Sequence, residues 1–379
     1  MSPVDALFFL ANAFFLYVTL VFLLAFLENR ERALRNPKPR RFPSLSIIIP
    51  AFNEEDCIAK TMRAASRLRY PKRLEIIVVD DGSSDETLRI ARETAKEIKG
   101  KASVKVIHQK NAGKAAALNT GLREAHGELV ATVDADSLPH EDALLKMVGY
   151  FNDTKVAAVT ASVKIHKPRS FVQLLQFVEY VSMNYLRKAS AFIQGISCTP
   201  GPLSVFRASV FEKIGGFDEG NVTEDTEIAL RLQKHGFRIE NALDAVVESE
   251  APYSLAGLVR QRVRWYHGAL LNAGKYSSLF FNKRVGAFGW FVYPTNFIAV
   301  AFSIFVLFRL AVMLWERILF AAFGAATNAA VAAAAVAGAQ AAQPTQLDSV
   351  VSVVSVVFDP RMLFTVDVLF VAVYIALVV

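Results

Sequence analysis

Apolar residues gather at the two ends of the chain, whereas the middle alternates short apolar runs with charged segments. The first apolar stretch, Ala6–Leu27, carries no charge and is rich in Phe and Leu. A run of about 20 such residues is long enough to cross the hydrocarbon core of a bilayer. It lacks the basic start and the small-residue exit of a cleaved signal peptide. We therefore expect residues 1–28 to form a permanent membrane-spanning helix, with Met1 outside and Glu28 inside.

The chain becomes apolar again from Phe288, so residues 285–379 are expected to form a C-terminal membrane region. Four segments in it are candidates to lie in or against a bilayer: Gly289–Phe308, Ile318–Ala339, Val350–Phe358 and Leu363–Val378. The first can span, and the second is so rich in Ala that its insertion is only weakly favoured. The third could be interfacial or re-entrant, and the fourth is a short candidate for the last span. Arg309 is then either a snorkelling residue at a helix end or a functional charge, because charge inside a bilayer is costly.

The middle of the chain, residues 44–253, begins with a regular alternation of β-branched apolar runs and segments of helical period. The predicted strands are Leu45–Pro50, Glu75–Asp80, Val104–His108 and Leu129–Val133. The predicted helices are Cys57–Leu68, a segment that follows Asp85 and ends at Ile98, and Ala115–Ala125. Strands that alternate with helices indicate an α/β domain with a mostly parallel, Rossmann-like sheet, whose ligand site lies at the carboxyl ends of the strands.

The order is less regular after Asp136. The elements predicted there are the strand Val156–Ile165, the helix Phe171–Ala191, the turn and strand of Cys198–Phe206, the helix Ile228–His235 and the helix Ser254–Leu271. The first of these helices has an apolar face made of Phe171, Leu174, Leu175, Phe177, Val178 and Val181. Such a helix either packs in a core or lies in the membrane interface.

Charge and composition indicate which kinds of partner the chain could bind, such as a membrane or a nucleic acid. The chain has 379 residues, of which 53% are hydrophobic, and a net charge of +7. Much of the positive charge lies in the expected juxtamembrane linker of residues 29–43, at Arg30, Arg32, Arg35, Lys38, Arg40 and Arg41. Basic residues directly after a span favour a cytoplasmic location for the domain that comes next in the chain. A charge this modest does not indicate nucleic-acid binding.

Cysteine and histidine usage argues against two kinds of site. The 2 cysteines, Cys57 and Cys198, stand in unrelated contexts, and the 6 histidines show no ligand spacing. Neither pattern predicts a disulfide framework or a zinc site.

Two carboxylates follow the last strand of the regular alternation. Asp134 and Asp136 stand one residue apart, and Ser137–Pro139 is expected to break the chain just beyond them. Paired carboxylates at a strand end can share a hard divalent cation, which prefers oxygen ligands. Alone, an Asp-x-Asp is more often an acidic loop that caps a helix, here one starting near His140.

Three further polar residues stand at expected element ends. Asp81, before Gly82, could accept a hydrogen bond from a nucleotide base. Lys114 follows Asn-Ala-Gly at a helix start, where an ammonium and backbone N–H groups would suit a phosphate. Asp225 stands at a helix N-terminus, where it could be a general base or simply a favourable partner of the helix dipole. Each signal is weak by itself.

Gln261, Arg264 and Trp265 share one face of the last predicted helix, within residues 254–284. The Trp ring offers a stacking surface for a sugar, and the Arg can pair bidentately with phosphate. The alternative is a basic amphipathic helix on anionic lipid, with Arg260 and Arg262 binding the lipid.

Six short motifs together carry a resemblance to a known family. They are Pro50-Ala-Phe-Asn-Glu54, Asp80-Asp-Gly-Ser83, Asn111-Ala-Gly-Lys114, Asp134-Ala-Asp136, Thr223-Glu-Asp225 and Gln261-Arg-Val-Arg-Trp265. In this order the chain resembles the processive, membrane-embedded glycosyltransferases of family 2, which include cellulose, chitin, hyaluronan and poly-N-acetylglucosamine synthases. The resemblance covers about Leu45–Gly268, and Gln-x-x-Arg-Trp is the motif that separates polymer synthases from simpler relatives.

The resemblance implies a GT-A-like cytosolic domain with interfacial amphipathic helices, flanked by transmembrane helices in the plasma membrane. It implies a metal-dependent inverting hexosyltransferase that extends a β-linked polysaccharide from a UDP-sugar. Uridine would lie by Ala51, Glu54 and Asp81, and Mg²⁺ or Mn²⁺ with the diphosphate at Asp134 and Asp136. Lys114 would belong to the same donor site. Asp225 would be the base, and Gln261, Arg264 and Trp265 would hold the diphosphate and the acceptor end.

Other interpretations stay open. A non-processive transferase would pass one sugar to a lipid carrier or glycolipid, and a non-catalytic membrane scaffold would keep the fold without the chemistry. We favour UDP-N-acetylglucosamine as donor from the character of Thr223–Gly268. A second copy of the chain or an accessory membrane subunit is compatible with all of these interpretations.

Overall fold

The computed structural model describes residues 3–98, 100 and 102–336, and they divide into two compact units. The larger unit is Val21–Pro294, and the smaller one comprises residues 3–20 and 295–336. All strands of the sheet belong to the larger unit.

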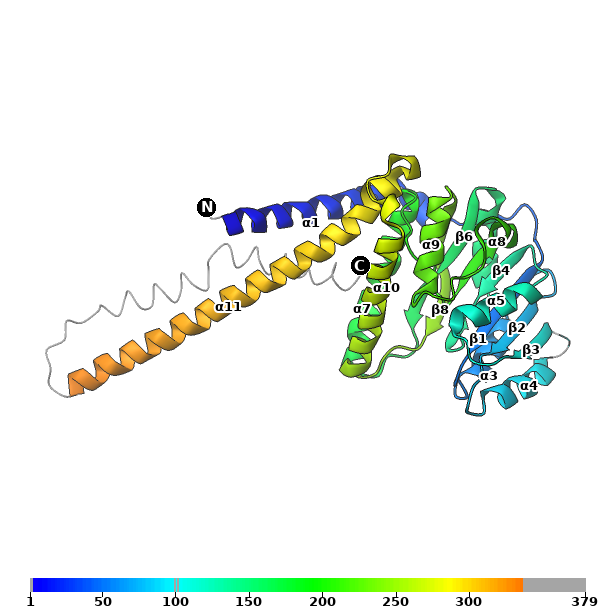
Figure 1. The fold of residues 1–379 in the computed structure, drawn as a ribbon, viewed down its shortest axis with the longest axis horizontal. Coiled ribbons are helices and arrows are strands. Elements are labelled where there is room, and N and C mark those ends of the chain that lie inside the picture. Colours follow the sequence, from blue (N-terminus) through cyan, green and yellow to red (C-terminus); the bar gives the residue numbers. More distant parts are fainter. Residues whose placement is uncertain (1–2, 99, 101, 337–379) are drawn as a thin grey trace. The chain divides into compact units, whose positions relative to one another are not determined.

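An eight-stranded mixed sheet, in the order β3-β2-β1-β4-β7-β6-β8-β5, forms the centre of the larger unit (Figure 1). The strands are β1 (Leu45–Ala51), β2 (Glu75–Asp80), β3 (Ser103–His108), β4 (Leu129–Thr132), β5 (Ser137–Pro139), β6 (Val156–Ile165), β7 (Ser204–Arg207) and β8 (Arg238–Ser249). The first four pair in parallel, as predicted. In the other half β7 is antiparallel to both β4 and β6, β8 is parallel to β6, and β5 is antiparallel to β8.

The parallel half is covered on both faces, which explains its continuous apolar strands. Alternate residues of β1 point to opposite sides. Ile47 and Ile49 pack in the core that includes α3 (Ile58–Ser66) and α4 (Thr87–Ile98). Ile48 packs on the other face with residues of α5 (Lys114–Glu124). The predicted strands and helices of this half are therefore confirmed, with ends shifted by one or a few residues.

The antiparallel half contains the main corrections. Ser137–Pro139 was expected to break the chain, but it forms the edge strand β5, and helix α6 begins only at Ala143 (Ala143–Val148). Pro139 is tolerated because it occupies an edge strand. The strand β8 and the helix α8 (Ala208–Ile214) had no counterpart among the predicted elements. A one-turn helix, η1 (Gly149–Asn152), continues α6.

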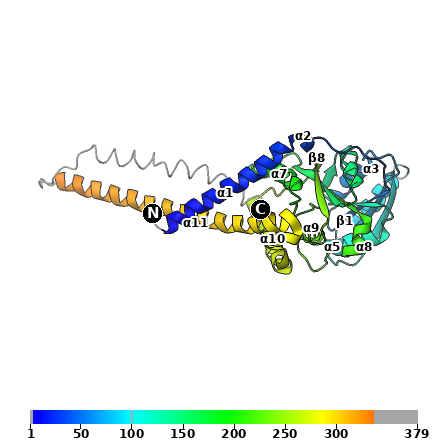
Figure 2. The same cartoon turned by 90° about the horizontal axis from the view of Figure 1, so that it is seen from above.

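Three helices accompany the antiparallel half: α7 (Phe171–Phe192), α9 (Glu224–Lys234) and α10 (Leu255–Lys275) (Figures 1 and 2). α7 packs against β6 and β8, α9 packs against β8, and α10 packs against α9. α7 begins with a capping box, in which Ser170 accepts from the backbone of Gln173 and Gln173 bonds back. The predicted Phe171–Ala191 and Ser254–Leu271 helices are confirmed. The short elements α2 (Arg30–Ala33), η2 (Ser277–Leu279) and η3 (Lys283–Val285) complete this unit.

Two long apolar helices, α1 (Pro3–Glu28) and α11 (Tyr293–Val336), supply the smaller unit. There Phe14 and Phe302 meet edge to face, and Arg309 lies 3.9 Å from Asp5. Pro3–Glu28 and Phe288–Ala321 are each long and apolar enough to cross a membrane.

The prediction of separate spans at Gly289–Phe308 and Ile318–Ala339 is wrong for the described residues. A π-turn at Phe288–Val292 leads into one continuous helix that contains the rest of the first segment and runs on to Val336. No Gly or Pro separates Phe308 from Ile318, so nothing in the sequence ends the helix there. Residues 337–339 and the segments Val350–Phe358 and Leu363–Val378 lie outside the described residues.

The packing of α5 on the sheet generates a stability prediction. A Cβ added at Gly121 would lie 2.4 Å from Cγ2 of Ile48 on β1. Because the core cannot expand freely, we expect Gly121→Ala to lower the free energy of unfolding by about 1–3 kcal/mol. The measurement is thermal unfolding of the detergent-solubilised chain.

The matched control is Gly274→Ala in α10, where an added Cβ meets nothing within 4 Å. Ala is the better helix former, so this variant should be as stable as the parent chain or more stable. Equal destabilisation by both substitutions would contradict the close approach of α5 to β1.

Candidate active site

A cavity of about 430 Å³ lies at the carboxyl ends of the parallel strands. It is lined by Pro50, Ala51, Phe52, Glu54, Asp81, Asn111, Gly113, Lys114, Ala117, Asp134, Ala135 and Asp136. Six of these are the residues that the sequence places at the donor and metal site: Ala51, Glu54, Asp81, Lys114, Asp134 and Asp136. The structure therefore brings together residues from four separate motifs, although their individual roles stay predictions.

Lys114 forms the central contact of this group. It is the first residue of α5, after Gly113 with its positive φ of 94°. Its Nζ lies 2.6 Å from Oδ1 of Asp134 and 3.1 Å from Oε1 of Glu224. Burial acts to lower the pKa of Lys114, but the two carboxylates outweigh it and raise that pKa. Lys114 is therefore a permanent cation that joins the end of β4 to the start of α9.

The acids around Lys114 outnumber it. Burial, followed by the charges of Asp136 and Asp134, raises the pKa of Glu54 to about 7. Burial and the charge of Asp134 raise the pKa of Asp136 to about 6. Burial is the largest cause in both cases, and repulsion between the carboxylates adds to it, although Lys114 opposes the rise at Asp136. The cluster would become more stable with a further cation.

This donor set fits a hard divalent cation that is completed by ligand oxygens. Among the described residues no group of three or more Asp, Glu, His or Cys side chains is arranged to hold a metal by itself. Two carboxylates, Asp134 and Asp136, line the cavity, and Asp134 is also paired with Lys114 through Oδ1. Mg²⁺ is commonly bound by one or two carboxylates together with substrate phosphates, so the pair suits such an ion.

Asp81 has a more structural position than the sequence indicated. Its Oδ1 accepts from the side chain of Gln109 at 2.7 Å and from the backbone N–H of Ala112 at 3.0 Å. Its Oδ2 accepts from the backbone N–H of Gly113 at 2.8 Å. Asp81 thus holds the loop that precedes Lys114 while it also lines the cavity. A contact of Asp81 with a nucleotide base remains a prediction.

Asp225 lies in the first turn of α9, beside Glu224. The turn before β7 fixes this end of the helix, because the N–H and hydroxyl of Thr199 donate to the backbone carbonyl of Asp225 at 3.1 and 2.9 Å. Burial and the charge of Glu224 raise the pKa of the Asp225 carboxyl to about 6, while Lys114 opposes the rise. Asp225 therefore belongs to the same electrostatic cluster as the cavity acids.

The role of Glu224 was missed in the sequence. Its neighbour Asp225 was singled out, but only the fold shows that Glu224 reaches Lys114. The backbone of Gly201 also lies close to the Lys114–Asp134 pair, since an added Cβ would lie 2.5 Å from Asp134 and 2.7 Å from Lys114.

The helix α10 carries the remaining predicted residues, which lie outside the cavity lining. Arg264 is exposed and donates weakly to the carbonyl of Val222, 3.4 Å away. Oε1 of Gln261 is buried and has no hydrogen-bond partner among the described residues. Trp265 lies under the guanidinium of Arg262, 4.3 Å from the ring centroid.

The suggestion that Arg262 binds lipid is wrong for this structure. Its guanidinium is buried against α7, 2.6 Å from the carboxylate of Glu179, whereas Arg260 is exposed. A pairing partner on another helix cannot be recognised from the spacing of residues along α10.

The C-terminal half of α10 is anchored on α9. Gly268 faces Thr223 so closely that an added Cβ would lie 2.2 Å from its hydroxyl oxygen. Nδ2 of Asn272 donates to the same hydroxyl at 3.1 Å. Lys275 and Tyr276 both bond the buried carboxylate of Glu227. These contacts hold α10 against the helix that carries Asp225.

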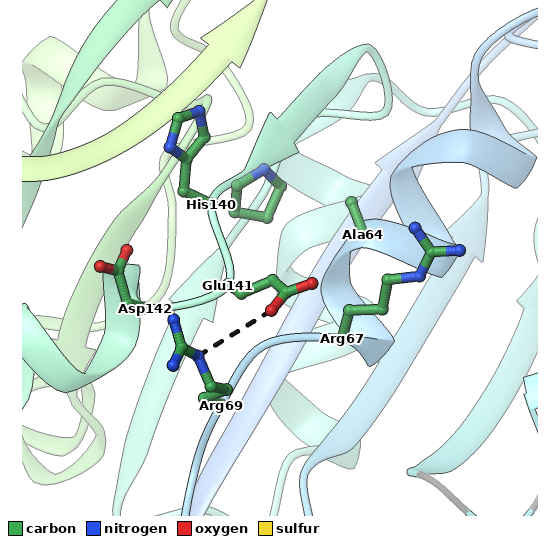
Figure 3. Close-up of a pocket in the computed structure, with 7 residues that line it drawn as sticks. Ala64, Arg67, Arg69, His140, Glu141 and Asp142 are labelled. Atoms are coloured by element: carbon green, nitrogen blue, oxygen red, sulfur yellow. Dashed lines mark ion pairs between the residues drawn. The ribbon is translucent and has the colours of Figure 1, made fainter.

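Figure 3 shows a second hollow of about 450 Å³, formed where α3 ends and around the segment that follows β5. Its lining residues are Ala64, Arg67, Arg69, Pro139, His140, Glu141 and Asp142. The ion pair drawn there joins Arg69 to Glu141 at 3.9 Å, and both side chains are mostly exposed. Solvent-exposed ion pairs of this kind contribute little to the stability of the fold. None of the predicted site residues lies in this hollow.

Comparison with known proteins agrees with the geometry. The family model described as "Glycosyltransferase like family 2" matches residues 43–268. The chain belongs to glycosyltransferase family 2. This assignment rests on more than half of the chain and covers every site residue described above.

Two curated relatives and one solved structure are similar to this glycosyltransferase. A "Probable glycosyltransferase YdaM" of Bacillus subtilis is 33% identical in a region that covers 65% of this chain and 60% of the relative's length. A "Poly-beta-1,6-N-acetyl-D-glucosamine synthase" of Staphylococcus aureus is 32% identical in a region that covers 59% of this chain and 54% of the relative's length. The matches thus span little more than half of these relatives. The mannosyltransferase PcManGT of Pyrobaculum calidifontis, solved with GDP-mannose and Mn²⁺, shares the fold, with a TM-score of 0.61, 22% identity and 97% coverage of both chains.

Gly201→Ala tests the close packing around Lys114. The added methyl group would collide with the Asp134–Lys114 pair, so we expect glycosyl transfer to fall at least about tenfold, while the unfolding temperature changes by no more than a few degrees. Transfer is measured as sugar incorporated from a nucleotide donor.

Gly220→Ala is the matched control, because the nearest atom to its added Cβ is 3.5 Å away. It should transfer sugar at the parental rate. Parental activity in Gly201→Ala would show that the ion pair tolerates displacement and would contradict the geometry above.

Proposed function

We propose that this family 2 glycosyltransferase is an inverting, processive enzyme that polymerises a UDP-sugar, best UDP-N-acetylglucosamine, into a β-linked polysaccharide. The observation that carries the proposal is the bridge made by Lys114. It joins Asp134, from the expected donor site, to Glu224, the neighbour of the expected base. Donor and base groups are thereby held in one cluster, as a single in-line displacement needs.

The cavity supports a nucleotide-sugar donor. Uridine would lie by Ala51, Glu54 and Asp81, with the diphosphate toward Lys114. Mg²⁺ or Mn²⁺ would be held by Asp134 and Asp136, which the surplus of acid there favours. When bound, the cation would neutralise charge on the departing diphosphate.

Asp225 is assigned as the general base. Its half-buried carboxyl is not part of the cavity lining but interacts electrostatically with Glu224, Lys114 and Asp134, and a base poised near the working pH is efficient. It would take the proton from the attacking hydroxyl of the acceptor. Inversion at the sugar then follows from one displacement without a covalent enzyme intermediate.

The helix α10 is assigned to the diphosphate and acceptor end, through Gln261, Arg264 and Trp265. The attachment of its C-terminal half to α9, the helix that carries Asp225, supports this assignment. The Trp ring would stack on the sugar at the acceptor end.

The larger unit has an apolar surface suited to a bilayer. Exposed apolar side chains of α7 and α10 include Phe171, Leu174, Leu175, Val178, Val181, Leu255, Val259, Val263 and Leu270. Soluble proteins seldom expose so many apolar residues on neighbouring helices. We assign this surface to the cytoplasmic face of the plasma membrane. Residues 1–28 and 285–379 would be multi-pass membrane regions through which the polymer leaves.

The test is a donor screen with the full chain in lipid nanodiscs, using radiolabelled UDP-sugars and Mn²⁺. Product of high molecular weight that a β-glycosidase degrades supports the proposal. One sugar per lipid, extracted into organic solvent, would replace it with transfer to a lipid acceptor. The absence of UDP release with every donor would leave a non-catalytic scaffold.

Asp225→Asn tests the base. The amide has nearly the same shape but cannot take the proton, so transfer should fall by about 10²–10⁴-fold while UDP affinity stays within about twofold. Titration calorimetry with UDP and Mn²⁺ gives the affinity. A large loss of UDP affinity with residual transfer would assign Asp225 to donor binding instead.

The raised pKa of Asp225 predicts a pH dependence. A free Asp loses its proton near pH 4, whereas this carboxyl keeps it up to about pH 6. Its basic form therefore disappears as pH falls through about 6, and kcat/KM should decline about tenfold per pH unit below that value. Rates between pH 5 and 8 at saturating metal measure this. A flat profile down to pH 5 would contradict the assignment.

A further inference from the structure

A buried ion pair connects α7 to α10. Nη2 of Arg262 lies 2.6 Å from Oε2 of Glu179, and the two side chains are only 12% and 5% exposed. The outer faces of the same helices carry exposed apolar residues such as Val178 and Val263. A charged pair buried beneath an apolar surface is costly to desolvate, so it requires an explanation other than stability alone.

The same guanidinium makes a second contact. Its central carbon lies 4.3 Å from the centroid of the Trp265 ring, within the distance of a cation–π interaction. Arg262 and Trp265 stand three positions apart on α10, which places them on one side of the helix. Arg262 is therefore held by Glu179 and in turn covers Trp265.

The pair has capacity for a second bond. Nε of Arg262 and Oε1 of Glu179 are both buried and lack a hydrogen-bond partner among the described residues. Together these two atoms would complete a bidentate arginine–carboxylate fork. Burial raises the pKa of Glu179 to about 7 against the opposing effect of Arg262. Removal of either partner would leave the other charge buried alone.

The residue next to Glu179 in the chain is within electrostatic range of both the ion pair and the cavity. Burial is the main cause that raises the pKa of Tyr180, and the charges of Arg262, Glu179 and Asp136 also act on it.

We propose that Glu179 is a positioning residue, which holds Trp265 in place for the acceptor through Arg262. The proposal rests on the acceptor-side assignment of Trp265 made above. It differs from a purely structural role, because Asn272, Lys275 and Tyr276 attach the other half of α10 to α9 independently. Loss of the pair therefore frees the Trp265 end of the helix while the rest stays attached.

The variants are Glu179→Gln, which keeps the shape without the charge, and Arg262→Lys, which keeps the charge without the planar fork. Arg260→Gln is the matched control, because Arg260 is an exposed arginine of the same helix. All are made in the full chain with Trp290→Phe and Trp315→Phe, so that Trp265 is the remaining tryptophan. Thermal unfolding identifies any variant that fails to fold.

Three readouts are used in nanodiscs with UDP-N-acetylglucosamine and Mn²⁺: Trp265 emission, polymer formed, and UDP released by hydrolysis. We expect Glu179→Gln and Arg262→Lys to shift the emission and to lower polymer yield at least about tenfold, with hydrolysis within about twofold of the parent. The double variant should be no worse than either single one, because both act through one contact. Arg260→Gln should match the parent.

Unchanged emission and polymer yield in Glu179→Gln would overturn the proposal. So would equal losses of polymer and hydrolysis in both variants, which indicate general destabilisation. If either variant fails to fold, the other decides by the same criteria. A shifted emission with full polymer yield would support the link between Glu179 and Trp265 but remove Trp265 from the acceptor role. Failure of the parent chain to use any donor would instead overturn the proposed function.

Discussion

A single ammonium group holds the candidate active site together. Lys114 contacts Asp134 at the end of β4 and Glu224 at the start of α9. The carboxyl groups around it would otherwise repel one another in a partly buried setting, as the raised pKa values of Glu54 and Asp136 show. Because the charge of Lys114 is permanent, the end of β4 and the start of α9 are held together before any ligand binds.

The two halves of the sheet contribute differently to this contact. The parallel half supplies the cavity and Lys114 itself, on strands and a helix buried in a continuous core. The antiparallel half and the helices beyond it supply Glu224 and Asp225. The close approach of Gly201 to Asp134 and Lys114 leaves no room for a side chain between the two halves. The family match covers both halves and ends at Gly268, where α10 meets Thr223.

The surface beyond the site combines two requirements on the same helices. α7 and α10 present apolar residues outward, while Glu179 and Arg262 meet between them. The apolar residues suit a lipid surface, whereas the buried charges set the position of one helix on the other. The apolar pattern of such a helix predicts its contact with lipid, but it does not predict the ion pair that fixes the helix on its neighbour.

Local sequence patterns determined the parallel half of the fold and six of the residues that line the cavity. Continuous β-branched runs between helical segments identify buried parallel strands, and polar residues at their carboxyl ends must meet at one edge. The long apolar ends were likewise evident from composition. Where the expectations were wrong, as for β5 and for the separate spans within α11, the local signals were weak. The short edge strand depends on its partner β8, and the continuous helix lacks any breaking residue.

Only the tertiary structure decided how distant polar groups pair. Glu224 forms an ion pair with Lys114. Asp81 accepts hydrogen bonds from the backbone of the loop before α5. Arg262 pairs with Glu179 inside the protein and does not point outward to lipid. The spacing of residues along one helix or strand fixes which side they share, but it contains no information about the element that will pack against that side. Ion pairs between residues far apart in the chain arise from that packing, and with them the electrostatics of the site.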